Sequence, residues 1–259
     1  MLSFFEISFY FAYFFLAGSS ALTAFEVFSY FPKQYEALKY ILAIETTVNV
    51  IASVAYNKLI TLIEKPNYGN ITNFRYLDWF ATTPLLLLSF TLYLQYLKNK
   101  DEDKDEDKES VKESNNKNIE NMDVEKKANK SIVSFDYSKI GIILLLNIIM
   151  LIFGFLGESN KLNHTFACII GFIPFTIMFY LIWKWYGDYI KNKTIFGIFL
   201  IVWSLYGIVY FLPNNSKNIS YNILDVIAKV GFGLLIWAEV VNLRFNNKIP
   251  NKDNFTNID

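Results

Sequence analysis

The chain has 259 residues, a formal net charge of zero and a hydrophobic share of 53%. This share exceeds the roughly 45–50% that soluble domains reach even when glycine is counted. The charge balance argues against a nucleic-acid-binding protein, because neutralising phosphates requires a basic surface. A single cysteine, Cys168, and a single histidine, His164, exclude an internal disulfide framework, a Cys-rich zinc site and a His cluster for a metal.

Long apolar segments dominate the chain. A helix needs about 20 apolar residues to span a bilayer, and only helices or closed barrels satisfy every backbone group in lipid. The segments lack the alternating pattern of barrel strands. The sequence therefore predicts an all-α membrane protein, a bundle of seven transmembrane helices at about 4–30, 36–62, 74–97, 138–157, 163–186, 194–213 and 220–243.

One connection differs from the others in length and charge. Residues 98–135 are rich in Lys, Glu, Asp and Asn and include the run DEDKDEDKE at 101–109. Such a segment buries too little apolar surface to offset its ordering entropy, so we expect a flexible, solvated loop; a binding role is the alternative. The expected organisation is one domain: helices one to three in 1–97, the charged loop in 98–135, helices four to seven in 136–245 and a tail in 246–259.

Basic residues near the helix ends predict the orientation, because cytoplasmic loops carry the excess of Lys and Arg. Eight of them fall on one side of the predicted bundle: Lys33, Lys39, Lys98, Lys100, Lys184, Lys191, Lys193 and Arg244. Four fall on the other side: Lys58, Lys65, Lys161 and Lys217. We therefore expect an integral membrane protein with its N-terminus outside, and with the charged loop and the C-terminus in the cytoplasm.

Four ionisable residues fall at membrane depth, where each is expensive and is a functional candidate by default. Arg75 and Asp78 lie one turn apart in the third segment, and Asp225 and Lys229 are four residues apart in the seventh, so each pair shares a face. Two structural ion pairs would explain the charge balance. They would not explain the aromatic residues and the Thr-Thr-Pro sequence around them.

Three motifs make the chain resemble the microbial (type 1) rhodopsins. They are RYLDW followed by TTPLLL in the third segment, WSLYGIVY at 203–210 in the sixth, and D-x-x-x-K-x-x-FG in the seventh. The resemblance covers all seven segments in order. The loop after the third segment is longer than the family usually carries. The Asn-, Lys- and Ile-rich composition and the third-helix pattern of Asp78, Thr82 and Ser89 are also similar to rhodopsins of large algal viruses.

The resemblance implies all-trans retinal, bound covalently as a protonated Schiff base on Lys229. Asp78 and Asp225 are the implied counterions, and Arg75 keeps both carboxylates ionised. Asp78 is also the implied acceptor of the Schiff-base proton after photoisomerisation, assisted by the hydroxyl of Thr82.

The expected retinal pocket is mainly aromatic, although each member taken alone is typical of an ordinary core. It comprises Trp79, Thr83, Asn147, Met150, Gly154, Met178, Trp203, Tyr206 and Tyr210. Asn147 is expected to hydrogen-bond Thr83. Gly171 stands where the family commonly has a pocket Trp, and Gly207 where it commonly has a Pro, so packing at the ring end and the colour stay open.

The cytoplasmic half departs from the pattern of efficient pumps, which often carry a carboxylic acid where this chain has Ser89. Glu45 in the second segment aligns with that position, and we expect Glu45 and Ser89 to form one polar site. Glu45 would then be a displaced proton donor or a channel gate, with Asn49 on the same face. A solvated or interfacial Glu45 is the alternative.

Two main functions follow from the resemblance. The intact set of Arg75, Asp78, Thr82 and Asp225 favours an outward proton pump. Ser89, Glu45 and the lack of a carboxylate pair in the last outside turn favour a light-gated cation channel. A photosensor is a third reading, and no enzyme is expected. The expected partners are membrane lipid and protons or small cations, without nucleic acid; a homo-oligomer stays open, since family members commonly form trimers or pentamers.

Overall fold

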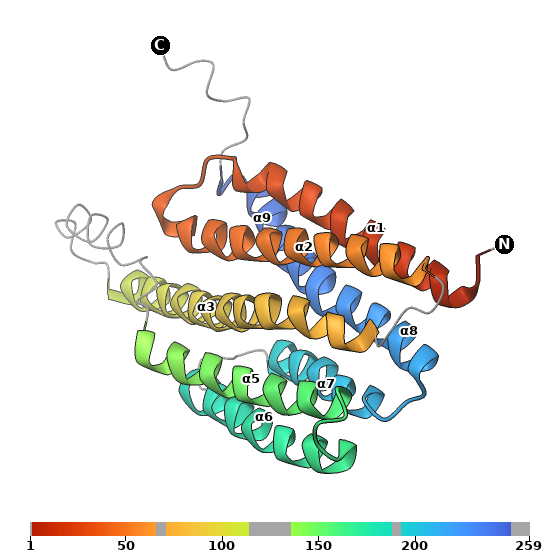
Figure 1. Cartoon of the computed structure of the whole chain (residues 1–259). Helices are drawn as coiled ribbons and strands as arrows, with labels where there is room; N and C mark the ends of the chain where they lie inside the picture. The colour runs from red at the N-terminus through yellow and green to blue at the C-terminus, as the bar shows by residue number, and fades with distance from the viewer. Residues whose placement is uncertain (1, 66–70, 114–135, 188–192, 250–259) are drawn as a thin grey trace.

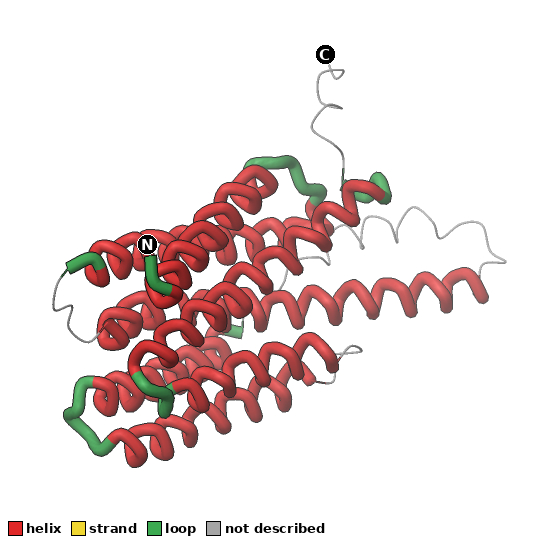
Figure 2. Tube along the Cα trace, turned by 90° about the vertical axis from the view of Figure 1, so that its right-hand side faces the viewer, coloured by secondary structure: helices red, strands yellow, loops and turns green. Residues whose placement is uncertain are grey.

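A computed structural model of the chain describes residues 2–65, 71–113, 136–187 and 193–249. Within these ranges the chain is helical, with short loops and no strand (Figure 2). The helices are α1 (Phe4–Val27), η1 (Lys33–Tyr35), α2 (Glu36–Ile63), α3 (Ile71–Glu113), α5 (Tyr137–Glu158), α6 (His164–Tyr186), α7 (Lys193–Val209), α8 (Asn214–Asp225), η3 (Val226–Gly231) and α9 (Phe232–Phe245).

These elements make seven rods, because α8, η3 and α9 follow one another without a break. Among the described residues, five helices are both long and apolar enough to cross a membrane, while α7 is apolar but has 17 residues. The helix α3 packs between α2 and α5, and α1 packs on α2 and on the last rod (Figure 1). The predicted segments are thus confirmed, most of them to within a few residues at each end.

The bundle is apolar on its outer surface and charged in its interior. Large side chains such as Phe14, Phe25 and Ile201 are more than half exposed, whereas Arg75 and Lys229 are 1% exposed. A soluble protein would have the opposite distribution, because buried charges are expensive and exposed apolar patches attract partners. The distribution is the one expected for a bundle surrounded by lipid, with its polar groups facing inward.

The helix α3 is longer than predicted. It continues through 98–113, so the expected flexible loop from 98 to 135 is wrong in its first part, and 114–135 lie outside the described residues. The chain has no Pro or Gly between Pro84 and Gly141, and Lys and Glu are good helix formers. Extending an existing helix requires no new nucleus, so it passes the membrane end as a projecting rod (Figure 2).

Small residues let α5 and α6 approach closely. A Cβ atom at Gly157 on α5 would lie 2.7 Å from the Cβ of Ala167 on α6, and even closer to the hydroxyl oxygen of Tyr210. Helices in membranes associate through close packing of this kind, since lipid tails are as apolar as the side chains. A Cβ at Gly141, on the same helix, meets nothing within 4 Å.

We therefore expect Gly157→Ala to destabilise the bundle, by about 1–3 kcal/mol as for other overpacked interiors. Gly141→Ala is the matched control and should leave stability unchanged or slightly raised, because alanine favours a helix more than glycine does. The measurement is the midpoint of thermal unfolding in detergent. Equal midpoints for the two variants would contradict the close contact between α5 and α6.

Candidate functional site

The centre of the bundle holds a lysine between two aspartates. The amine nitrogen of Lys229 lies 2.5 Å from Oδ2 of Asp78 on α3 and 3.7 Å from Oδ1 of Asp225, four residues earlier on its own rod. All three side chains are at most 2% exposed. Lys229 lies in η3, a segment of π-helix, and such segments are frequent at functional sites. The shared face expected for Asp225 and Lys229 is confirmed.

Asp225 is the most heavily hydrogen-bonded group of this centre. Its Oδ1 accepts hydrogen bonds from the hydroxyl of Tyr206 at 2.8 Å and from Nε1 of Trp79 at 3.2 Å. Its Oδ2 accepts one from the hydroxyl of Tyr56 at 2.8 Å and lies 3.6 Å from Arg75. Asp78 differs: its Oδ2 contacts Lys229, while its buried Oδ1 has no hydrogen-bond partner.

Arg75 closes one side of the centre. Its Nη1 donates to the hydroxyl of Tyr56 at 2.9 Å and its Nε donates to Oδ1 of Asn218 at 2.8 Å, and Nη2 donates to Oδ1 of Asn222. The sequence reading missed these three partners. A signal was present for the two asparagines, because Asn218, Asn222 and Asp225 recur at helical spacing along one face of the last rod, but not for Tyr56 on α2.

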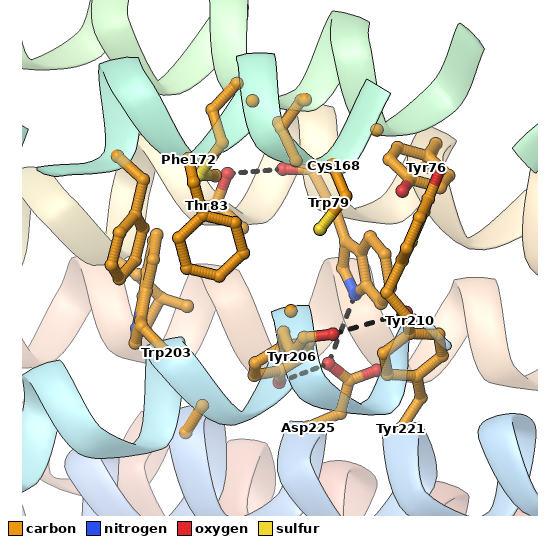
Figure 3. A pocket seen from close by; sticks show the side chains of 18 of the residues that line it. Tyr76, Trp79, Thr83, Cys168, Phe172, Trp203, Tyr206, Tyr210, Tyr221 and Asp225 are labelled. Atoms are coloured by element: carbon orange, nitrogen blue, oxygen red, sulfur yellow. Dashed lines mark hydrogen bonds between the residues drawn. The ribbon is translucent and has the colours of Figure 1, made fainter. Parts of the chain in front are cut away.

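An apolar cavity adjoins the lysine (Figure 3). The space between its side chains amounts to about 830 Å³, which includes an opening toward the outside of the bundle. Its walls come from α3, α5, α6, α7 and the last rod. The lining residues are Tyr76, Trp79, Thr83, Leu86, Met150, Leu151, Gly154, Ala167, Cys168, Gly171, Phe172, Phe175, Trp203, Tyr206, Gly207, Tyr210, Tyr221, Asp225, Ala228 and Lys229.

Most of the predicted pocket lines this cavity. Seven of the nine predicted residues are in its wall, and the other two, Asn147 and Met178, are fully buried but outside it. The expected bond is confirmed: the amide of Asn147 donates to the hydroxyl of Thr83 at 2.8 Å. The hydroxyl of Thr82 donates to the backbone carbonyl of Asp78 at 2.9 Å, rather than to its carboxylate.

Glu45 and Ser89 form a second polar site. The Ser89 hydroxyl donates to Oε1 of Glu45, and both side chains are fully buried, as is Asn49. Oε2 of Glu45 and Oδ1 of Asn49 are buried without a hydrogen-bond partner. The expected pairing of Glu45 and Ser89 is confirmed, and the alternative of a solvated Glu45 is wrong because α2 turns this side chain inward. Ser89 lies 11 residues beyond Asp78, about 16 Å along the helix.

The acidic residues near the opposite end of the bundle differ in burial. Glu64 is exposed and Glu6 is half-buried, whereas Glu158 is 6% exposed. Oε1 of Glu158 accepts a hydrogen bond from the amine of Lys217 at 2.7 Å and lies 3.5 Å from His164. This ion pair joins the end of α5 to the start of α8.

The comparisons with known proteins agree with this geometry. A family model described as "Bacteriorhodopsin-like protein" matches residues 5–243. The chain belongs to this rhodopsin family. Its members are membrane proteins that bind retinal, and the amine, the paired carboxylates and the apolar cavity found here fit that group.

Similar proteins come from bacteria and viruses. The green-light absorbing proteorhodopsin of the gamma-proteobacterium EBAC31A08 is 26% identical over an alignment of 188 residues, and the match covers 66% of this chain and 61% of the relative's length. The crystal structure of the viral rhodopsin OLPVRII matches 93% of this chain and 99% of its own, with 28% identity and a TM-score of 0.72. Xanthorhodopsin, at 19% identity and a TM-score of 0.65, with 90% of each chain covered, shares the fold.

The Tyr56 hydroxyl joins Arg75 to Asp225, so we expect Tyr56→Phe to lower the free energy of unfolding by about 1–3 kcal/mol, the usual penalty for an unsatisfied buried group. Tyr40→Phe is the matched control, because the Tyr40 hydroxyl also donates to a carboxylate, that of Glu36, but at the exposed surface. Thermal unfolding in detergent measures both. A loss of the same size in the two variants would show that burial of this bond is unimportant.

Proposed function

We propose that the chain is a light-driven outward proton pump with all-trans retinal bound covalently at Lys229. The observation that carries this proposal is the placement of buried carboxyl groups on both sides of one buried amine. Asp78 contacts the amine itself, and Glu45 is bonded to Ser89, about three turns along α3 from Asp78. A pump needs a proton acceptor and a proton donor on opposite sides of the Lys229 nitrogen, which loses and regains a proton in each cycle.

The two aspartates are suited to different roles. Asp225 receives three hydrogen bonds and lies beside Arg75, so both of its oxygens already have partners. Asp78 has one oxygen without a partner and touches the amine, so it is the carboxylate that accepts a proton at least expense. Retinal, when bound, supplies the light absorption and the change of shape that moves the proton-bearing nitrogen. Arg75 and Asp225 keep the charge on the outer side of the site.

Glu45 is suited to return a proton. Its carboxyl is fully buried, its contact is a neutral hydroxyl, and among the described residues no cation lies within ion-pair distance of it. An isolated ionised carboxylate in such surroundings is very unfavourable, so Glu45 is held as the neutral acid. A neutral acid has a proton to give. Ser89 then orients the carboxyl group, a role that a hydroxyl can perform without titrating.

A light-gated cation channel is the second candidate. The unpartnered oxygens of Glu45 and Asn49 favour it, because they would suit a hydrated path. Along α2, α3 and the last rod, the buried apolar residues Ala52, Leu86 and Val230 fall in sequence between the residues of this site and those of the lysine centre, and we take them as an apolar section. A cation can cross an apolar section only if the helices open a hydrated path that lasts. A proton needs only a brief chain of hydrogen bonds. This section is the reason to place the pump first.

The proposed direction of transport depends on the orientation. The basic side chains expected at the cytoplasmic end place Glu45 toward the cytoplasm and Arg75 toward the outside, with the N-terminus outside. Protons would then enter through Glu45 and leave past Arg75. The buried Glu158 lies at the exit end, and its pairing with Lys217 supports a structural role there.

Photocurrent under voltage clamp tests the proposal. A pump gives outward current on illumination at zero membrane potential and with equal solutions on both sides. A channel gives current that reverses with the cation gradient, and that result would replace the pump by the second candidate. Asp78→Asn should abolish the outward current and shift the absorption to the red, since it removes the charge nearest the amine. Protein that stays colourless with all-trans retinal would remove both candidates.

Glu45→Gln tests the donor. Proton transfer by a positioned acid is typically worth about 10²–10⁴ in rate, so the return to the dark state should slow by at least about tenfold. It should also become slower as the pH rises, because the proton must then come from solution. Glu36→Gln, on the same helix but at the exposed surface, is the control and should cycle normally. A normal, pH-independent recovery in Glu45→Gln excludes Glu45 as the donor.

A further inference from the structure

The wall of the cavity between α6 and α7 contains two glycines in very different surroundings. A Cβ atom at Gly171 would meet the carbonyl oxygen of Met150 at 3.5 Å and the Cβ of Phe153 at 3.6 Å, both ordinary contacts. A Cβ at Gly207 would meet Cζ and Cε2 of Phe172, far inside the 3.0 Å that real Cβ contacts keep. Phe172 therefore occupies the space that a side chain at Gly207 would need. The space beside Gly171 has no such close contact.

Phe172 is the neighbour that occupies this space. Its ring edge lies against Gly207, it lines the cavity, and the residue is 36% exposed. A phenylalanine has only two side-chain torsions, so its ring cannot bend away as a long flexible chain would. Any side chain at position 207 must therefore displace the ring, either into the cavity or out toward the lipid.

The ring lies at the end of the cavity away from the charged centre. In Figure 3, Phe172 and Trp203 are on one side of the view, and Asp225 is on the other. Retinal has its aldehyde at one end of the polyene and its ring at the other. A retinal attached at Lys229 that fills the cavity lengthwise therefore brings its ring to the wall that Phe172 forms.

We propose that Phe172, fixed in place by Gly207, is the residue that positions the ring of the chromophore and limits the ring size that the site accepts. This inference rests on retinal binding at Lys229, and not on transport. Gly171 has no side chain to pack against the ring. The next residue along α6, Phe172, supplies one, and the absence of a side chain at Gly207 leaves room for it. The conjugation between ring and polyene depends on the twist between them, so this contact also sets the absorption maximum.

A double-mutant cycle tests the contact between Phe172 and Gly207, because coupled residues give non-additive effects. Gly207→Ala should shift the absorption maximum and speed the loss of colour in hydroxylamine by about tenfold, as expected from overpacking. Phe172→Ala should shift the maximum as well. In the double variant the alanine at 207 should add nothing to the effect of Phe172→Ala. Gly197→Ala, on the same helix α7 with nothing within 4 Å of its Cβ, is the control and should match the unaltered protein.

Two further readouts separate the possible failures. Phe172→Ala should bind a ring-enlarged retinal analogue that the unaltered protein excludes, and this holds even if Gly207→Ala alone does not fold. Additive effects in the cycle, or the same analogue preference in both proteins, would overturn the role of Phe172. A colourless unaltered protein would instead overturn the proposed function, which the ring-end contact presupposes.

Discussion

The ion pair between Lys229 and Asp78 sets the conditions that the rest of the structure has to meet. An isolated charge in the middle of a bilayer is expensive, so the amine needs anions, and the anions in turn need donors. Two carboxylates face one amine, and Arg75 brings the second cation that balances them. The surrounding tyrosine, tryptophan and asparagine side chains supply the hydrogen bonds that water would otherwise provide. The polar groups around Lys229 and Arg75 therefore form one connected group rather than a set of separate pairs.

The polar groups of the bundle are divided into two sites of opposite character. The centre around Lys229 is charged and, apart from Oδ1 of Asp78, dense with hydrogen bonds, whereas the site of Glu45 and Ser89 has few hydrogen bonds and holds no cation among the described residues. Charged networks resist rearrangement, because each member loses several contacts at once. A sparsely bonded acid is easier to move or to hydrate. This difference suits one site to hold a charge and the other to release a proton when it is required.

The sequence was sufficient to predict the seven helices, because long apolar segments are a strong signal. It was also sufficient to single out the charged residues, because a charge buried in lipid is costly and is usually functional. It also placed Glu45 beside Ser89. It failed at the end of α3, where helix propensity and the lack of breakers outweighed polarity. It also could not show that Thr82 bonds a carbonyl, that Tyr56 bridges Arg75 and Asp225, or that Phe172 fills Gly207. Those contacts join atoms of different helices or depend on side-chain torsions, and periodicity along one helix does not determine either.

The π-helical segment from Val226 to Gly231 determines which side chains of the last rod, before and after it, point toward α2. Successive residues of an α-helix turn by about 100°, so one additional residue in a turn rotates everything that follows by that angle. Before the segment, Asp225 points to Tyr56 and Arg75; after it, Gly233 faces Asn49 and Glu45 on the same neighbour, α2. Removing that residue would leave the half up to Asp225 in register and turn the half after Gly231 away from α2. The widened turn thus rotates the second half of the rod about its axis, so that one helix contributes residues to both polar sites.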